Sequence, residues 1–150
     1  MEVIVTTDRS EIKLNELPVR LEYFQMYTLC FICEKCKTSI FINEPDYKMR
    51  TTKIIDMGPL TSKHCSNEFL AKMLLLFRNM KFNEVNSIRF LEFSFDNNQY
   101  LASYFTKICR VCDAKYLIIY DEKIGEDGGG KIPREAIRII FNEIVLAPEW

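Results

Sequence analysis

Two short cysteine-containing segments, residues 30–36 and 109–112, constrain the fold of this chain more than any other feature of its sequence. They contain five of the six cysteines, and residues 37–108 separate them. Cys-x-x-Cys spacing occurs at 30/33, 33/36 and 109/112, whereas random placement would give on the order of 0.2 such pairs. A two-residue gap lets a tight turn direct both thiolates at one ion, with Zn–S distances of about 2.3 Å. Two such turns would complete a tetrahedral site only if these distant segments meet in the fold.

Three allocations of the cysteines are compatible with this spacing. The first, which we favour, is the symmetric four-thiolate set typical of structural zinc: Cys33, Cys36, Cys109 and Cys112. The second replaces Cys36 with Cys30. Because the residues that follow Cys30 read as the end of a strand, that cysteine is better interpreted as a small buried hydrophobic residue. In the third allocation all six cysteines are reduced and free of metal.

The residues that follow each cysteine pair predict a strand. Residues 37–42 and 113–120 are rich in apolar and β-branched side chains, so each pair would lie between two strands. Two β-hairpins that each present a cysteine pair at the tip resemble the zinc-ribbon class of metal-binding domains. The resemblance covers the two knuckles, residues 30–42 and 108–120, and it implies a structural zinc ion. Neither knuckle contains the Gly or Pro that is common there.

The sixth cysteine, Cys65, follows the only histidine, His64, just before a predicted helix. A thiol near a helix N-terminus has a lowered pKa and gains nucleophilicity, so a Cys–His catalytic pair is one interpretation. A substitute metal ligand is another. Neighbouring side chains on an extended chain point in opposite directions, however. We therefore expect a loop histidine beside a partly buried cysteine.

Composition and charge indicate one compact domain spanning residues 1–150. The chain is 48% hydrophobic and carries 20 Lys and Arg against 21 Asp and Glu, a balance not typical of a disordered chain or of a strongly basic tail. Residues 1–20 lack the apolar stretch of a signal peptide, and no apolar run approaches the roughly 18 residues of a membrane helix. We expect a cytoplasmic, intracellular chain without a membrane segment. In a reducing compartment clustered cysteines bind metal, whereas a secreted chain would allow three disulfides.

Hydrophobic periodicity predicts an α+β fold: a mainly antiparallel sheet of five or six strands, with one or two helices. Ser66 is a candidate N-cap for a helix over 67–80, in a helical insert of residues 66–80 between the knuckles. Residues 133–146 carry apolar side chains at i, i+3, i+4 and i+7 after Pro133, which favours a helix despite many β-branched residues. Strands are predicted at residues 21–32, 39–42, 87–95, 100–108 and 115–120.

Several other features have structural interpretations. The Gly-rich residues 125–131 lack the Ser or Thr that follows Lys in a phosphate loop, so a hairpin tip or linker is expected. Asp121 and Glu122 are expected in a solvated turn, and Trp150 is expected either to pack on the core or to meet a partner. Five cations near the knuckles would offset the charge of a four-thiolate zinc centre or meet a phosphate backbone. They are Lys35, Lys37, Lys107, Arg110 and Lys115.

No catalytic constellation is recognisable in the sequence. Four thiolates saturate zinc and leave no position for water, so the metal would be structural. We expect a non-enzymatic protein–protein interaction or inhibitory module with a protein partner. A nucleic-acid-binding or transcription-associated zinc-ribbon protein is the first alternative, and a thiol redox protein is the second. An interaction module predicts an exposed apolar patch, for which Tyr23, Phe24 and Trp150 are candidates. The sequence carries no signal for an oligomeric state.

Overall fold

The computed structural model describes residues 2–6, 11–14, 17–22, 28–42, 57–124 and 136–149. These residues form mostly antiparallel strands and one α-helix, which confirms the predicted fold class. The helix is α2, Asn67–Leu76. The strands are β1 Val3–Thr6, β2 Glu11–Leu14, β3 Val19–Glu22, β4 Thr28–Ile32, β5 Ser39–Ile42, β6 Met57–Pro59, β7 Lys81–Val85, β8 Ile88–Phe95, β9 Asn98–Leu101, β10 Ser103–Ile108, β11 Lys115–Ile124 and β12 Ala136–Leu146.

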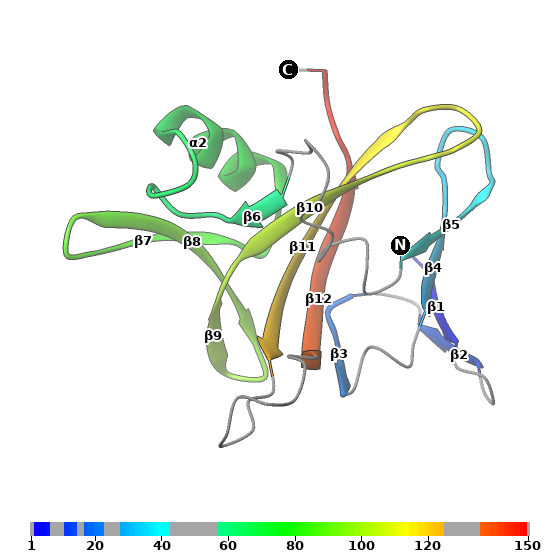
Figure 1. Ribbon diagram of the computed structural model, residues 1–150, viewed down its shortest axis with the longest axis horizontal. Helices are drawn as coiled ribbons and strands as arrows, with labels where there is room; N and C mark the ends of the chain where they lie inside the picture. Colours follow the sequence, from blue (N-terminus) through cyan, green and yellow to red (C-terminus); the bar gives the residue numbers. More distant parts are fainter. Residues whose placement is uncertain are drawn as a thin grey trace, which may run out of the picture.

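The strands of the described residues pair in three sheets, more than the one sheet of five or six strands that the sequence predicts. Their orders are β2-β1-β4-β5, β3-β12-β11-β10-β6 and β7-β8-β9. Figure 1 shows β10, β11 and β12 in the middle, with the four-stranded sheet on one side and α2 with β7 and β8 on the other. The sequence pattern does not predict β1, β2, β6 or β7, because each has only three to five residues, too few for a period to show.

The five-stranded sheet is buried on both faces, as strand β11 illustrates. Tyr116, Ile118 and Tyr120 lie in the core shared with the four-stranded sheet. Leu117 and Ile119 lie in the core shared with α2 and the three-stranded sheet. Because successive side chains of a strand point to opposite faces, a strand buried on both faces must be apolar throughout. The continuous apolar run of the sequence therefore marks the centre of the fold.

The predicted C-terminal helix is wrong, because residues 136–146 form strand β12. This strand pairs with β11 along its length and with β3 through residues 138–141. The β-branched side chains that disfavour a helix suit a strand buried between two neighbours. Pro133, the predicted start of the helix, lies outside the described residues.

A β-bulge in β12 explains why this strand has helical spacing in its sequence. Tyr120 pairs with Phe141, but the preceding residue of β11 pairs with Glu143, so Asn142 is an extra residue in β12. The insertion places Phe141 and Ile144, three residues apart, in the same core. A strand interrupted by a bulge thus mimics the i, i+3 repeat of an amphipathic helix.

Two further predicted strands are each divided between sheets. Residues 21–32 contribute to β3 in the five-stranded sheet and to β4 in the four-stranded sheet, and residues 23–27 lie outside the described part. Residues 100–108 divide at Ala102, so that β9 pairs with β8 and β10 pairs with β11. Hydrophobicity does not reveal a change of sheet, because both sheets bury similar side chains. The predicted strands 39–42, 87–95 and 115–120 are confirmed as β5, β8 and β11.

Helix α2 begins where the sequence predicts, but it ends at Leu76 rather than at residue 80. The Ser66 hydroxyl accepts a hydrogen bond from the Phe69 amide at 3.1 Å, which confirms the N-cap. Leu70 and Met73 are the buried residues of the helix. Phe77 follows in an extended conformation and is also buried, so the predicted helical period continues after the helix has ended.

Asp121 and Glu122 lie within β11, not in a solvated turn as predicted. Arg138 Nη1 on β12 donates to Asp121 Oδ2 at 3.0 Å, and both side chains are largely buried. Burial raises the pKa of Asp121, although the Arg138 guanidinium opposes this shift. The acidic pair therefore belongs to strand β11 rather than to a turn.

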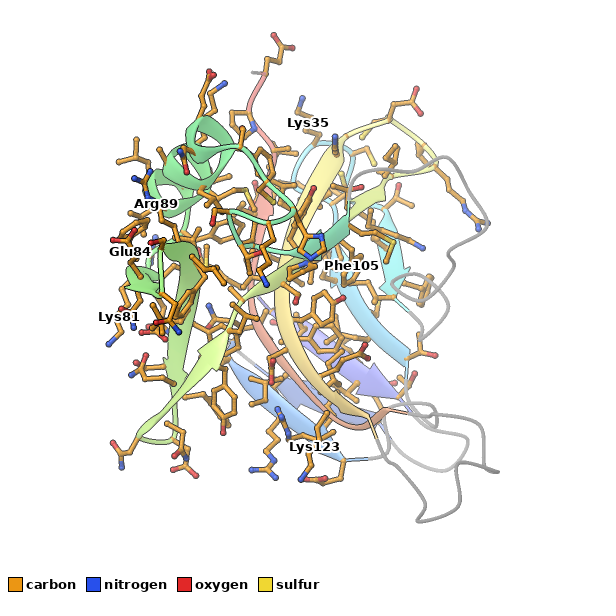
Figure 2. All side chains as sticks on the ribbon, turned by 60° about the vertical axis from the view of Figure 1, so that its left-hand side comes forward. Lys35, Lys81, Glu84, Arg89, Phe105 and Lys123 are labelled. Carbon is orange, nitrogen blue, oxygen red and sulfur yellow. The ribbon has the colours of Figure 1, made fainter. Side chains whose placement is uncertain are left out.

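Charged side chains are exposed on the β7–β8 hairpin. Figure 2 shows Lys81, Glu84 and Arg89 projecting from β7 and β8, and Arg89 Nε lies 3.6 Å from Glu84 Oε1. Among the described residues no helix has the length and apolar character needed to cross a membrane. The predictions for residues 125–131 and for the candidate patch residues concern positions outside the described part: Tyr23, Phe24 and Trp150.

Candidate metal centre

The two cysteine pairs meet in space, as the sequence predicts. Residues 33–36 form the turn between β4 and β5, and residues 109–112 form the turn between β10 and β11. Figure 1 shows the tips of these two hairpins side by side. The Sγ atoms all lie within 4.8 Å of one another, and they belong to Cys33, Cys36, Cys109 and Cys112. The favoured ligand set is therefore the one that the fold brings together.

The sulfur–sulfur distances fit a shared ion better than disulfides. Cys33 Sγ lies 3.6 Å from Cys112 Sγ, and Cys36 Sγ lies 3.5 Å from Cys109 Sγ. A disulfide requires about 2.05 Å, and all four cysteines are free thiols. Four sulfurs arranged tetrahedrally around zinc at about 2.3 Å would be separated by about 3.8 Å. The contacts across the two knuckles are therefore close to those that one tetrahedral ion needs.

The two knuckles have the same backbone geometry. In the first, the Cys33 amide donates to Thr38 O and the Lys37 amide donates to Cys33 O, both at 2.9 Å. In the second, the Cys109 amide donates to Ala114 O at 2.8 Å and the Asp113 amide donates to Cys109 O at 3.0 Å. Equivalent turns present equivalent cysteines, so the pairs approach the common centre symmetrically.

Each knuckle uses a left-handed residue where glycine is common in such turns. Lys37 and Asp113, which follow the second cysteine of their pairs, both have φ of 62°. A Cβ atom makes this conformation unfavourable, and Asp tolerates it better than Lys does. The absence of Gly from the sequence therefore does not prevent the knuckle, but it leaves a local energetic cost at Lys37.

Lys37→Gly is expected to increase the free energy of unfolding by roughly 0.5–1 kcal/mol, because glycine adopts positive φ without a Cβ clash. Urea denaturation with and without bound metal would measure the change. Lys37→Ala is the matched control, since it also removes the contact between Lys37 Nζ and Glu34 O at 3.1 Å but keeps the Cβ atom. An unfolding midpoint for Lys37→Gly no higher than that of Lys37→Ala would contradict this explanation.

The first cysteine of each pair is buried and the second faces outward. Cys33 and Cys109 belong to the core beside the four-stranded sheet, whereas Cys36 is half-buried and Cys112 is exposed. The inner thiols therefore anchor the site to the core. The outer thiols lie on the side open to solvent.

The environment of the cluster shifts the pKa values of Cys33 and Cys112 in opposite directions. Burial disfavours the thiolate of Cys33, but hydrogen bonds from Tyr116, from backbone amides and from Cys112 lower its pKa to about 6. The Ala114 amide favours the thiolate of Cys112, but burial and hydrogen bonds to the other three cysteines raise its pKa to about 12. Thiolates this close repel one another, so a cation is needed before all four can ionise.

The two remaining cysteines lie outside this cluster. Cys30 is buried in β4 between Ile4 and Phe41 of the neighbouring strands, which agrees with the prediction of a small buried hydrophobic residue. The half-buried Cys65 thiol donates to Pro59 O at 3.6 Å, and His64 is exposed in a turn. Burial raises the pKa of Cys65. A thiol that has a raised pKa and is hydrogen-bonded to a backbone carbonyl is not activated as a nucleophile. The environment of Cys65 therefore does not favour the Cys–His catalytic interpretation.

Tyr116 and Thr38 contribute to the site, although the cysteine spacing predicts neither. The Tyr116 hydroxyl donates to Cys33 Sγ at 3.3 Å, and the Cys36 thiol donates to Thr38 Oγ1 at 3.2 Å. The Tyr116 hydroxyl reaches Cys33 only because the two hairpins pack together, so spacing along the chain gives no signal for this contact. Thr38, in contrast, lies two residues from Cys36 in the same knuckle.

Four of the five predicted cations are exposed at or beside the knuckle tips: Lys35, Lys37, Arg110 and Lys115. Figure 2 shows Lys35 at this end of the molecule. Glu34 and Asp113 are also exposed there, so the positive charge is not unbroken. The exposed charge around the knuckles is therefore of mixed sign.

A cleft of about 550 Å³ lies beside the first knuckle, between the end of α2 and the end of β12. Its wall includes Glu34, Arg78 and Glu143. The Arg78 amide donates to Glu143 Oε1 at 3.1 Å, and burial raises the pKa of Glu143 against this bond. The Glu143 carboxylate thus connects β12 to the chain that follows α2.

The fold and the cluster define a class of protein: a β-rich chain with a four-cysteine candidate metal centre formed by two hairpin tips. Comparison with protein-family models, with curated proteins and with solved structures finds no match in any of the three. The function therefore has to be argued from the site itself.

Proposed function

We propose that this chain is a non-enzymatic interaction module stabilised by one structural zinc ion in a zinc-ribbon-like site. The observation that carries the proposal is the convergence of four sulfurs, within 4.8 Å, from two hairpins remote in sequence. Thiolate ligands in a tetrahedral set are typical of zinc. The ion would join the β4–β5 hairpin to the β10–β11 hairpin, and so the four-stranded sheet to the five-stranded sheet.

The ligand set argues for a structural ion. Four thiolates complete the coordination of zinc and leave no position for water or substrate. Two of the ligands, Cys33 and Cys109, are buried in the core, so zinc binding and packing of the core would stabilise each other.

Native mass spectrometry of the purified chain tests the metal assignment. We expect one zinc ion per chain, and we expect a strong chelator to remove it and to lower the thermal unfolding midpoint. Cobalt substitution should give the intense thiolate-to-cobalt absorption of a tetrahedral four-sulfur site. A chain that is folded and free of metal after purification in zinc-containing buffer, and that takes up neither ion, would contradict the proposal.

Exposed apolar side chains on the two metal hairpins support the interaction role. Phe41 is 53% exposed and Ile32 is 45% exposed. They lie on the same face of the four-stranded sheet, since Phe41 pairs with Cys30 and Ile32 pairs with Ser39. On the second hairpin Ile108 and Val111 are also exposed. Apolar groups beside a charged metal site are suited to a protein partner with a complementary apolar surface.

The interaction role is tested by isolating a partner with the zinc-loaded chain and then measuring its affinity for purified variants. Phe41→Ser should weaken binding of the purified partner at least tenfold. Leu75→Ser is the matched control, because Leu75 is exposed on α2 and is not part of the metal hairpins. Equal affinities for the two variants would reject this surface. Salt-sensitive retention on heparin would instead favour the nucleic-acid alternative.

A further inference from the structure

The Tyr116 hydroxyl lies between the backbone of one knuckle and its buried thiol. It accepts a hydrogen bond from the Glu34 amide at 2.7 Å and donates one to Cys33 Sγ at 3.3 Å. Tyr116 belongs to β11, which follows the other knuckle. One side chain of the second hairpin therefore contacts both the turn and a sulfur of the first.

The Tyr116 ring is held firmly in place. It is fully buried, and it packs edge-on against Phe31 of β4 with ring centroids 5.1 Å apart and an interplanar angle of 73°. A ring fixed in this way cannot turn its hydroxyl away from Cys33 without disrupting the core. The position of the hydroxyl is thus set by the packing of the two sheets.

We propose that Tyr116 is a positioning residue of the metal centre, which fixes the Cys33 thiolate and strengthens its hold on the ion. A hydroxyl that donates to a metal-bound thiolate orients that ligand and stabilises its negative charge. The bond from Glu34 holds the hydroxyl in the donating orientation, because the oxygen lone pair is engaged with the amide. This inference rests on the proposed zinc site and adds a residue outside its four ligands.

The test compares Tyr116→Phe with Tyr120→Phe. Tyr120 lies on the same strand and in the same core, and its ring packs edge-on against Phe105 with a similar geometry, 5.4 Å and 71°. Tyr120 lies four residues after Tyr116 on β11, which places the two residues roughly 13 Å apart along the strand. The Tyr120 hydroxyl is therefore beyond reach of the sulfurs. Both substitutions remove one hydroxyl and keep the ring, so only the first removes a bond to the site.

Competition with a chromophoric chelator would measure zinc affinity, and the cobalt-substituted proteins would report on the ligand field. Tyr116→Phe is expected to weaken zinc binding roughly 10–100-fold, whereas Tyr120→Phe should change it less than twofold. Tyr116→Phe alone should shift the thiolate-to-cobalt absorption band, because that band depends on the charge carried by sulfur.

Two results would overturn the inference. One is equal zinc affinity and an unchanged cobalt spectrum for Tyr116→Phe and the wild-type chain. The other is a lower affinity that is matched by an equal loss of stability in the metal-free protein, because Tyr116 would then act only on the fold. Absence of zinc from the wild-type chain would instead reject the proposed function, so the two failures are distinguishable.

Discussion

Cys109→Ser is expected to abolish zinc retention and to remove much of the stability of the folded chain. The free energy of structural zinc binding, about 10–16 kcal/mol, shared among four ligands corresponds to roughly 3 kcal/mol for each, or at least a 100-fold loss of affinity. Cys109 is also buried, so the serine hydroxyl would be desolvated in the core. Native mass spectrometry and thermal unfolding would measure the two effects.

Three further substitutions separate loss of a ligand from damage to the core. Cys112→Ser removes an exposed ligand, so it should release zinc without placing a hydroxyl in the core. Cys30→Ser alters a buried cysteine outside the cluster, and Cys65→Ser alters a half-buried one. Both should keep zinc. The ligand assignment would be wrong if all these variants and Cys109→Ser retained zinc equally and lost stability equally.

Phe141→Ala is expected to lower the free energy of unfolding by roughly 3–5 kcal/mol. Phe141 is fully buried beside the bulge of β12, where this strand pairs with both β3 and β11. Removal of its ring would leave a cavity in the core that also contains Cys33 and Cys109. Urea denaturation monitored by circular dichroism would measure the loss.

Phe82→Ala is the matched control for this prediction. Phe82 lies on the exposed strand β7 and is 48% exposed, so its truncation should cost well under half as much. Equal losses for the two variants would therefore argue against the burial of Phe141 in the core.

The candidate site could be predicted from local spacing. The pairs 33/36 and 109/112 each form a knuckle because a two-residue gap imposes a tight turn, and such a turn depends on few distant contacts. The residues that flank each turn are either alternately apolar and polar or apolar throughout. The hairpins β4–β5 and β10–β11 could therefore be predicted as well. The N-cap at Ser66 is also a local feature, and it is confirmed.

Other elements depend on partners that local sequence does not identify. Strand β12 has helical spacing because Asn142 bulges where Tyr120 and its neighbour pair across the sheet. Residues 21–32 divide between two sheets although their hydrophobicity is continuous. Hydrophobic periodicity indicates which positions are buried, but it does not identify the element that packs against them.

The amino-acid sequence by itself determined which cysteines form each knuckle, because short spacing and turn formation are properties of neighbouring residues. Only the tertiary structure decided that the knuckles meet, that Tyr116 reaches Cys33, and that the C-terminal segment is a strand. These features depend on sheets that pack on both faces of β11. Side chains remote in sequence become neighbours only when that packing brings the strands together.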